Sequence, residues 1–211
     1  MSRQPPRGRR RDEAARKATG EWFIFGSASG GFVIAGYLTV TKLMGGSAAF
    51  CTAGGGCDAV QSSRYAMLLG VPVALWGALA YAAVAGLAAA GRTATRWQWA
   101  FAIAAGAVGF SAYLTWISAA VIGALCGYCL TSAAISVVLL ALLIWRRHAH
   151  AGRRGASPGR LVTIGGASAL GAIVVGAFIF AANPESAEPA YREALARHLT
   201  ARGMVMYGAF T

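Results

Sequence analysis

The sequence predicts an all-α integral membrane protein, a four-helix transmembrane bundle plus a fifth transmembrane helix. Hydrophobic residues make up 57% of the 211 residues, and the mean hydropathy is +0.55. Charged residues make up only 12%, whereas an average soluble domain has about 25%. The apolar residues are gathered in runs close to the ~20 residues that a helix needs to cross the hydrocarbon core of a bilayer.

Five apolar runs define the expected helices, which cover residues 22–44, 72–90, 99–123, 125–145 and 161–182. The second run begins with Pro72, and proline suits the first position of a helix. The first run is longer than the apolar core of a signal peptide, which has about 7–15 residues. We therefore expect an uncleaved anchor there, with a cleaved signal as the alternative. The small-residue stretches GSASGG and GGASALGAIVVG, in the first and fifth runs, favour close helix packing in lipid.

The basic residues predict the orientation of these helices. The formal net charge is +12, and most of the 19 Lys and Arg residues fall in residues 1–21, 91–98 and 146–160, between the apolar runs. Positive loops remain in the cytoplasm, so we expect a cytoplasmic N-terminus, with residues 45–71, 123–125 and 183–211 on the periplasmic or lumenal side. This distribution argues against a nucleic-acid partner, which would require a basic face on a folded domain. Four tryptophans fall at the cytoplasmic ends of the runs, as in an interfacial aromatic belt: Trp22, Trp97, Trp99 and Trp145.

Two close cysteine pairs fall on the predicted outer side, where disulfides persist. Cys126 and Cys129 open the fourth helix as CGYC. Residues three apart share a helix face, and the helix dipole stabilises a thiolate at the N-terminus, so this motif indicates redox chemistry. Cys51 and Cys57 flank TAGGG, whose glycines favour a flexible shuttle. Structural staples, or a zinc site built from all four cysteines, are the alternatives.

The segment FCTAGGGCDAVQSSRYAMLLGVPVALWG, followed by CGYC, resembles the vitamin K epoxide reductase family. The resemblance is closest to the bacterial branch, which couples disulfide formation to reduction of a quinone. It covers roughly residues 22–145, the family's four-helix core, and residues 161–182 resemble the fifth helix of some members. Residues 183–211 resemble the beginning of the thioredoxin-like domain that follows in those members. The chain ends at Thr211, before that domain's own redox motif, so we expect a truncated chain or a separate partner.

The resemblance implies a role for each cysteine. Electrons would pass from a thioredoxin-like periplasmic or lumenal protein to Cys51 and Cys57, then to Cys126 and Cys129, and finally to a quinone such as ubiquinone, menaquinone or phylloquinone. Cys51 would meet the partner, and Cys57 would exchange with Cys126. Cys129 would face the quinone, and no metal is implied.

A quinone pocket is expected beside these cysteines. After Cys57, Asp58 is a candidate N-cap for a short helix with Val60, Ser63 and Met67 on one face. Ser63 matches the family's Ser/Thr near the substrate, so its hydroxyl would donate to a quinone carbonyl. Alternatively, this hydroxyl bonds only to the backbone. Trp76 and Trp116 are further candidates for the pocket wall, with helix packing as the alternative.

The expected organisation therefore has five parts. They are a basic cytoplasmic tail (1–21), the catalytic core (22–145), a basic cytoplasmic loop (146–160), the fifth helix (161–182), and a periplasmic linker with the start of a thioredoxin-like domain (183–211). The expected activity is a quinone-dependent thiol–disulfide oxidoreductase that promotes disulfide formation in exported proteins. The alternatives are a reductase of vitamin K or its epoxide, and a non-enzymatic membrane carrier with structural disulfides. The carrier would need charged residues along a pathway inside the spans, and the apolar runs contain almost none.

Overall fold

Helices account for most of the computed structural model, which describes residues 7–46, 48, 49, 51, 55–90, 93–146, 158–182 and 198. The five long helices are α1 (Arg7–Leu43), α3 (Val73–Ala89), α4 (Ala94–Ile117), α5 (Gly127–Trp145) and α7 (Pro158–Ala182). The chain between α1 and α3 forms the short helix α2 (Gly56–Ser62), the 3-10 turn η1 (Arg64–Ala66) and the strands β1 (Met67–Leu68) and β2 (Val71–Pro72). A π-helix, η2 (Ser118–Ile122), continues α4.

Four helical segments are long and apolar enough to cross a membrane, within the ranges that the structure describes. They are Trp22–Leu43, Ala94–Ile122, Gly127–Trp145 and Gly159–Ala182. The remaining expected span, residues 72–90, corresponds to α3, which is apolar but has only 17 residues. The chain is therefore a multi-pass membrane protein with four long candidate spans and one shorter apolar helix.

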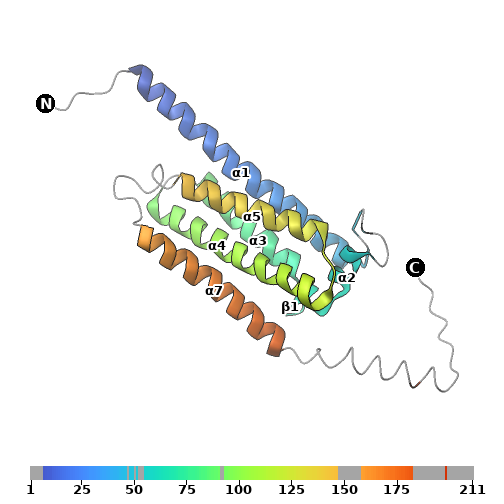
Figure 1. Ribbon diagram of the computed structural model, residues 1–211. Coiled ribbons are helices and arrows are strands. Elements are labelled where there is room, and N and C mark those ends of the chain that lie inside the picture. Colours follow the sequence, from blue (N-terminus) through green and yellow to red (C-terminus); the bar gives the residue numbers. More distant parts are fainter. Residues whose placement is uncertain are drawn as a thin grey trace.

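The helices α1, α3, α4 and α5 form a bundle, in which α1 contacts α3 and α5, and α4 contacts the same two helices. α7 packs along the outside of α4 (Figure 1). Small residues allow these close approaches. A Cβ built on Gly31 would lie 2.6 Å from the Tyr81 ring, and one on Gly109 would lie 2.8 Å from Ala169. The predicted role of small residues in the first and fifth runs is thus confirmed for α1 against α3 and for α7 against α4.

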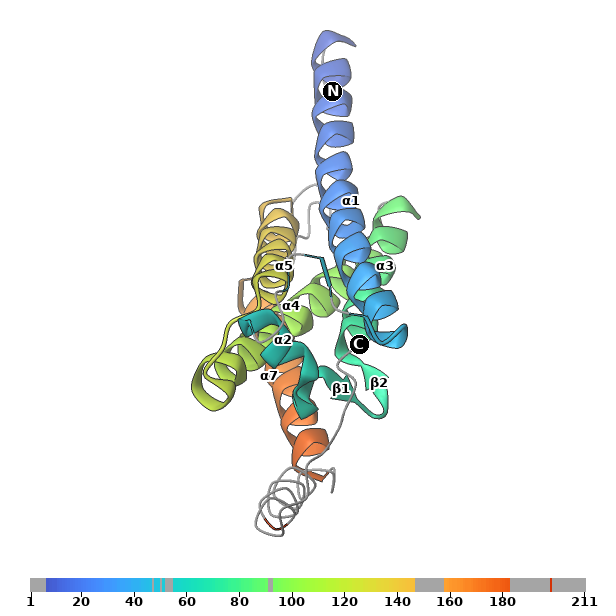
Figure 2. The same cartoon turned by 90° about the vertical axis from the view of Figure 1, so that its right-hand side faces the viewer.

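The connection between α1 and α3 folds over one end of the bundle, which we call the cysteine end because both cysteine pairs lie there. Figure 2 shows α2 and the β1–β2 hairpin gathered where α1 ends. The hairpin pairs Met67 with Pro72 and turns through Leu69 (φ 55°) and Gly70 (φ 76°). A two-residue turn with two positive φ angles matches the twist of its strands, so the chain reverses tightly before α3.

Several expected boundaries need correction. α1 begins at Arg7 rather than at residue 22, so most of the expected tail is helical. Its Ala, Arg and Glu residues are good helix formers, although they lack an apolar pattern. α4 begins at Ala94 rather than 99, because the Thr93 hydroxyl accepts the backbone N–H of Arg96 at 3.3 Å and caps the helix. The expected start of a thioredoxin-like domain at 183–211 lies outside the described residues, apart from His198.

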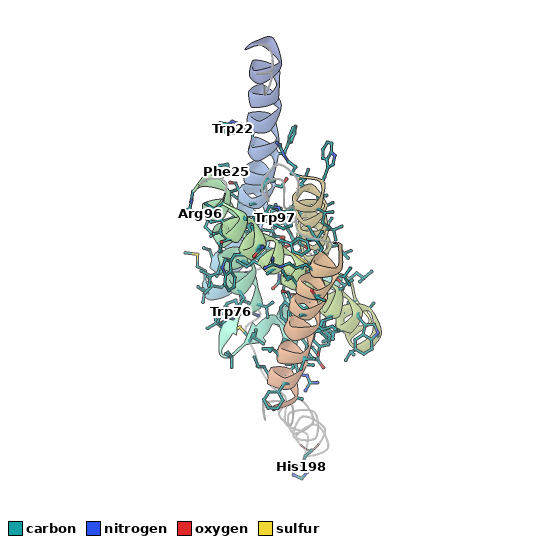
Figure 3. All side chains as sticks on the ribbon, turned by 90° about the vertical axis from the view of Figure 1, so that its left-hand side faces the viewer. Trp22, Phe25, Trp76, Arg96, Trp97 and His198 are labelled. Carbon is teal, nitrogen blue, oxygen red and sulfur yellow. A yellow bond between two sulfur atoms is a disulfide. The ribbon has the colours of Figure 1, made fainter. Side chains whose placement is uncertain are left out.

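The predicted aromatic belt is wrong at one of its four members. Trp22, Trp99 and Trp145 are exposed on the bundle surface. Trp97 is instead buried between the helices, where its ring stacks on Phe101 and its Nε1 donates to the carbonyl of Leu143 at 3.2 Å. Figure 3 shows Trp97 within the bundle and Trp22 on the outer side of α1. Trp97 is therefore a core residue that joins α4 to α5.

Candidate active site

The two cysteine pairs meet at the cysteine end of the bundle. Cys51 and Cys57 form a disulfide, while Cys126 and Cys129 are free thiols. The Sγ atoms of Cys57 and Cys126 lie 3.5 Å apart, although 69 residues separate them in sequence. Thiol–disulfide exchange requires direct approach of one sulfur to another, and this contact brings a free thiol against an existing disulfide.

The start of α5 positions the CGYC motif. The π-helix η2 ends at Ile122, and the C-cap residue Gly123, with a φ of 72°, lets the chain turn back. Cys126 is then the N-cap residue of α5, and its carbonyl accepts the N–H of Leu130 at 3.0 Å. Cys129 lies in the first turn. The expectation that CGYC opens this helix is confirmed, with α5 beginning at Gly127 rather than 125.

The thiol of Cys126 has an unusually low pKa. The thiol of Cys129 donates a hydrogen bond to the sulfur of Cys126 and lowers the pKa of Cys126 from 9.0 to about 6. The backbone N–H groups of Cys129 and Tyr128 also donate to this sulfur and lower its pKa further. Burial opposes this shift, because Cys126 is only 1% exposed and a buried charge is costly. The hydrogen bonds prevail, so Cys126 is mainly thiolate at neutral pH and a good leaving group in exchange.

This low pKa predicts a specific pH dependence. In the Cys51→Ser, Cys57→Ser variant, Cys126 and Cys129 are the only cysteines left. A thiolate with a pKa of about 6 is present above that pH and lost below it. Alkylation of Cys126 by iodoacetamide should therefore be nearly constant from about pH 7 upward and fall about tenfold for each unit below the pKa. Mass spectrometry of the alkylated peptide measures the rate.

Adding Cys129→Ala to that variant is the control, since it removes the main donor to Cys126. The midpoint of alkylation should then rise toward the ordinary thiol value of 9.0. The same midpoint in both variants would contradict the assigned cause of the shift.

Close backbone contact seats α2 on the CGYC motif. A Cβ built on Gly56 would lie 2.7 Å from the carbonyl oxygen of Leu125 and 3.3 Å from its nitrogen. Backbone atoms cannot yield as a flexible side chain can, so a larger residue would lift α2 from this contact. Gly56 thus serves close approach, which places the adjacent Cys57 against Cys126.

A cavity of about 140 Å³ lies inside the bundle beside Cys129. A single water needs only about 10–15 Å³ of such volume, so this space suits a ring-sized molecule. Its walls are mostly apolar, with several polar groups at defined points, as is usual for small-molecule sites. Segments far apart in the sequence contribute the polar lining, which comprises Lys42, Gln61, Tyr65, Ser111, Thr115, Ser118, Cys129 and Ser132.

The residues predicted to bind a quinone are not brought together in this cavity, except for Cys129. Ser63, Trp76 and Trp116 are not among its lining residues. The Ser63 hydroxyl donates to the carbonyl of Val60 at 2.7 Å, which is the backbone-satisfying alternative. The residues Trp76 and Trp116 are 42% and 62% exposed on the bundle surface.

The predicted amphipathic helix after Cys57 is shorter than expected. α2 ends at Ser62, and Ser63 has extended backbone angles, so the stripe of Val60, Ser63 and Met67 is interrupted. The N-cap residue is Gly55, and Asp58 lies inside the first turn. The cavity side of this segment is formed instead by Val60, Gln61, Tyr65 and Ala66.

Sequence reasoning missed every polar residue of the cavity lining except Cys129, and two of those missed make further contacts. Lys42, at the end of α1, lines the cavity and donates from Nζ to the carbonyl of Gln61 at 2.6 Å. Tyr65 lines the cavity from η1 and packs edge-on against Phe180 of α7. A lone lysine at the end of an otherwise apolar run was the available signal for the first. For Tyr65 the only signal was its place in SSRY.

The cysteines do not gather into a metal site. No group of three or more His, Cys, Asp or Glu side chains could hold a metal ion among the residues for which placement is described. Two of the four sulfurs are already bonded to each other, as the Cys51–Cys57 disulfide.

Comparisons of the sequence with known proteins find similarity over the bundle. The model of the Vitamin K epoxide reductase family matches residues 22–144, which is more than half of the 211 residues. Thiol-disulfide oxidoreductase LTO1 of Arabidopsis thaliana is 37% identical to this chain over 119 residues, which are 51% of this chain and 31% of that relative. The match therefore spans less than a third of the relative's length. Both cysteine pairs fall inside the region matched by the family model.

Proposed function

Because this chain belongs to the vitamin K epoxide reductase family, we propose that it is a membrane oxidoreductase that transfers electrons from a thioredoxin-like protein through its two cysteine pairs to a quinone. The observation that carries the proposal is the 3.5 Å contact between the Sγ atoms of Cys57 and Cys126. Through this contact, the Cys51–Cys57 pair, which would exchange with an external dithiol, meets the Cys126–Cys129 pair beside the cavity. In the cell this reaction would supply disulfide bonds to exported proteins.

The first transfer oxidises the partner. A thiolate of the reduced partner attacks the Cys51 sulfur, and Cys57 leaves as a thiolate. The second thiolate of the partner then displaces Cys51, so the partner gains a disulfide and the Cys51–Cys57 pair is reduced. Two electrons have moved from the partner to this chain.

The second transfer moves these electrons inward. The Cys57 thiolate attacks the Cys126 sulfur of a Cys126–Cys129 disulfide, and Cys129 leaves as a thiolate. Cys51 then attacks Cys57, which restores the Cys51–Cys57 disulfide and releases Cys126. The low pKa of Cys126 favours this release. The resulting state has one disulfide at Cys51–Cys57 and two free cysteines at 126 and 129, as in this structure.

The last transfer reduces the quinone. Cys129, whose sulfur lines the cavity, loses its proton as it supplies an electron pair to the quinone, and the Cys126 thiolate attacks the Cys129 sulfur to re-form their disulfide. The quinone takes up two protons with the two electrons and leaves as quinol. The overall reaction converts a dithiol and a quinone into a disulfide and a quinol.

We assign Lys42 as the group that binds a quinone carbonyl. Among the described residues that line the cavity, it alone carries a formal charge. Its Nζ uses one donor on the Gln61 carbonyl, and an ammonium group has three donors. Lys42→Met should raise the KM for quinone about tenfold or more, since a hydrogen bond to a charged group contributes about 1.5–3 kcal/mol. Steady-state quinol formation at varied quinone concentration measures this change.

Exchange in the absence of quinone provides the control for Lys42. Reduction of the Cys51–Cys57 disulfide by reduced thioredoxin in a single turnover should proceed at the wild-type rate in Lys42→Met. An unchanged KM in this variant would remove Lys42 from the quinone site.

The orientation proposed with this function places the cysteine end on the periplasmic or lumenal side and the N-terminus in the cytoplasm. The distribution of Lys and Arg between the apolar runs supports it. A thioredoxin-like protein on that side would then reach Cys51 without crossing the bilayer.

Purified wild-type protein in detergent tests the proposed function directly. Reduced thioredoxin and a soluble ubiquinone analogue should yield quinol and oxidised thioredoxin in a one-to-one ratio. No quinol above the protein-free rate, with any of a ubiquinone, a menaquinone and a phylloquinone analogue, would overturn the proposal. If vitamin K epoxide but none of the quinones were reduced, the chain would be a reductase of the epoxide instead.

A further inference from the structure

Two tyrosine hydroxyls hold the backbone of a single residue, Ala49, next to the redox cysteines. The N–H of Ala49 donates to the hydroxyl of Tyr37 on α1 at 2.8 Å. The carbonyl of Ala49 accepts from the hydroxyl of Tyr128 on α5 at 2.7 Å. The two rings lie against each other, with centroids 6.2 Å apart. Two helices that are distant in sequence thus converge on one peptide segment.

The segment that they hold leads directly to Cys51. The N–H of Cys51 donates to the carbonyl of Ala48 at 3.0 Å and closes a turn in which Ala49 is the second residue. Ala48 is buried, with 8% of its surface exposed. Holding Ala49 therefore fixes one end of the Cys51–Cys57 disulfide. The other end is fixed by the contact of Gly56 with Leu125.

Tyr128 contacts Cys126 of one redox pair and the segment that leads to the other pair. It is the third residue of CGYC, and its backbone N–H stabilises the thiolate of Cys126. Its side-chain hydroxyl bonds to the carbonyl two residues before Cys51. One residue thereby connects the site that accepts electrons with the segment that delivers them.

The fold does not require these hydroxyls to satisfy buried polar groups. Ala49 is exposed, and Tyr37 is 39% exposed. Water could satisfy the Ala49 N–H and carbonyl in place of the tyrosines. The two hydrogen bonds therefore position Ala49, and they are not needed to satisfy buried polar atoms.

We propose that Tyr37 and Tyr128 are positioning residues that hold Cys51 within reach of Cys57 and so favour resolution of the Cys57–Cys126 mixed disulfide. The proposal rests on the function proposed above. In the resolving step, the Cys51 thiolate attacks the Cys57 sulfur, a new Cys51–Cys57 bond forms, and Cys126 leaves as a thiolate. A Cys51 held close attacks at a higher effective concentration. Without the tyrosine hydroxyls, more of the protein should remain as the mixed disulfide.

An intramolecular equilibrium tests this role without partner or quinone. In a Cys129→Ala background with one disulfide, Cys57 bonds either to Cys51 or to Cys126. Acid quenching, alkylation of the free thiol and mass spectrometry give the ratio of the two forms. Tyr128→Phe should shift the ratio toward Cys57–Cys126 about three- to tenfold, the effect of one ordinary hydrogen bond. The phenylalanine keeps the backbone N–H that faces Cys126.

Tyr37→Phe provides an independent variant and should shift the ratio in the same direction. Tyr113→Phe is the matched control, since it deletes a hydroxyl on α4 away from Ala49, and should leave the ratio unchanged. Ratios within twofold of the parent for both Tyr37→Phe and Tyr128→Phe would overturn the proposal. An equal shift in Tyr113→Phe would also overturn it. Failure of the proposed function would appear separately, as absence of quinol formation by the wild-type protein.

Discussion

Replacing Cys126 or Cys129 with alanine is expected to abolish quinol formation with every dithiol substrate. Cys129 is the sulfur that lines the cavity, and Cys126 is the sulfur in contact with Cys57. No other cysteine can replace them, because the remaining two are Cys51 and Cys57. Loss of a covalent nucleophile commonly costs ~10³-fold or more in rate. Turnover in both variants should thus approach that of the uncatalysed mixture.

Quinol absorbance, followed with reduced thioredoxin and separately with dithiothreitol, measures this loss. Serine substitutions at the same positions should be equally inactive, since a hydroxyl cannot form a disulfide. Each variant should still bind quinone, which quenching of tryptophan fluorescence can monitor. Normal turnover in Cys129→Ala would show that electrons reach the quinone by another route.

Replacing Cys51 or Cys57 is expected to slow turnover with a protein dithiol far more than turnover with a small dithiol. Reduced thioredoxin should lose about a hundredfold or more in rate, because the intramolecular relay to Cys126 is broken. Dithiothreitol should retain most of its rate in the Cys51→Ala, Cys57→Ala variant. A small dithiol can enter the space left by the Cys57 sulfur, which otherwise lies 3.5 Å from Cys126.

The ratio of thioredoxin-driven to dithiothreitol-driven turnover is the informative quantity for these variants. A general loss of structure would lower both rates together, whereas loss of the relay lowers only the first. Equal losses with both substrates would indicate that the Cys51–Cys57 disulfide is a structural staple.

The helices were predictable from the sequence because each apolar run is bounded by basic or glycine-rich segments. α5 was placed to within two residues at its start and correctly at Trp145. The helix before residue 22 was not predictable from hydropathy, since Arg7 and the residues after it are polar helix formers. Trp97 was misassigned because its position at a helix end is compatible with both the lipid interface and the core, and only packing against Leu143 decides between them.

The candidate site was predictable only in part, for a physical reason. A CxxC motif has its chemistry within four residues, so CGYC could be recognised locally. The cavity beside it is formed by Lys42, Tyr65, Thr115 and Ser132, from four separate segments. No local pattern records which of these side chains face one another. Ser63 was assigned to the pocket from its place in the sequence, but its hydroxyl bonds to the backbone of its own segment.

The shortness of α3 bears on how the proposed lipid-soluble acceptor would reach the cysteines. Its 17 residues rise about 25 Å, several ångströms less than the ~30 Å of bilayer hydrocarbon. Its first turns, at Val73, Ala74 and Gly77, line the cavity, so this short apolar helix forms one wall of the space beside Cys129. If the proposed quinone enters past that wall, its mole fraction in the membrane, rather than its aqueous concentration, would govern how fast the reduced sulfurs are reoxidised.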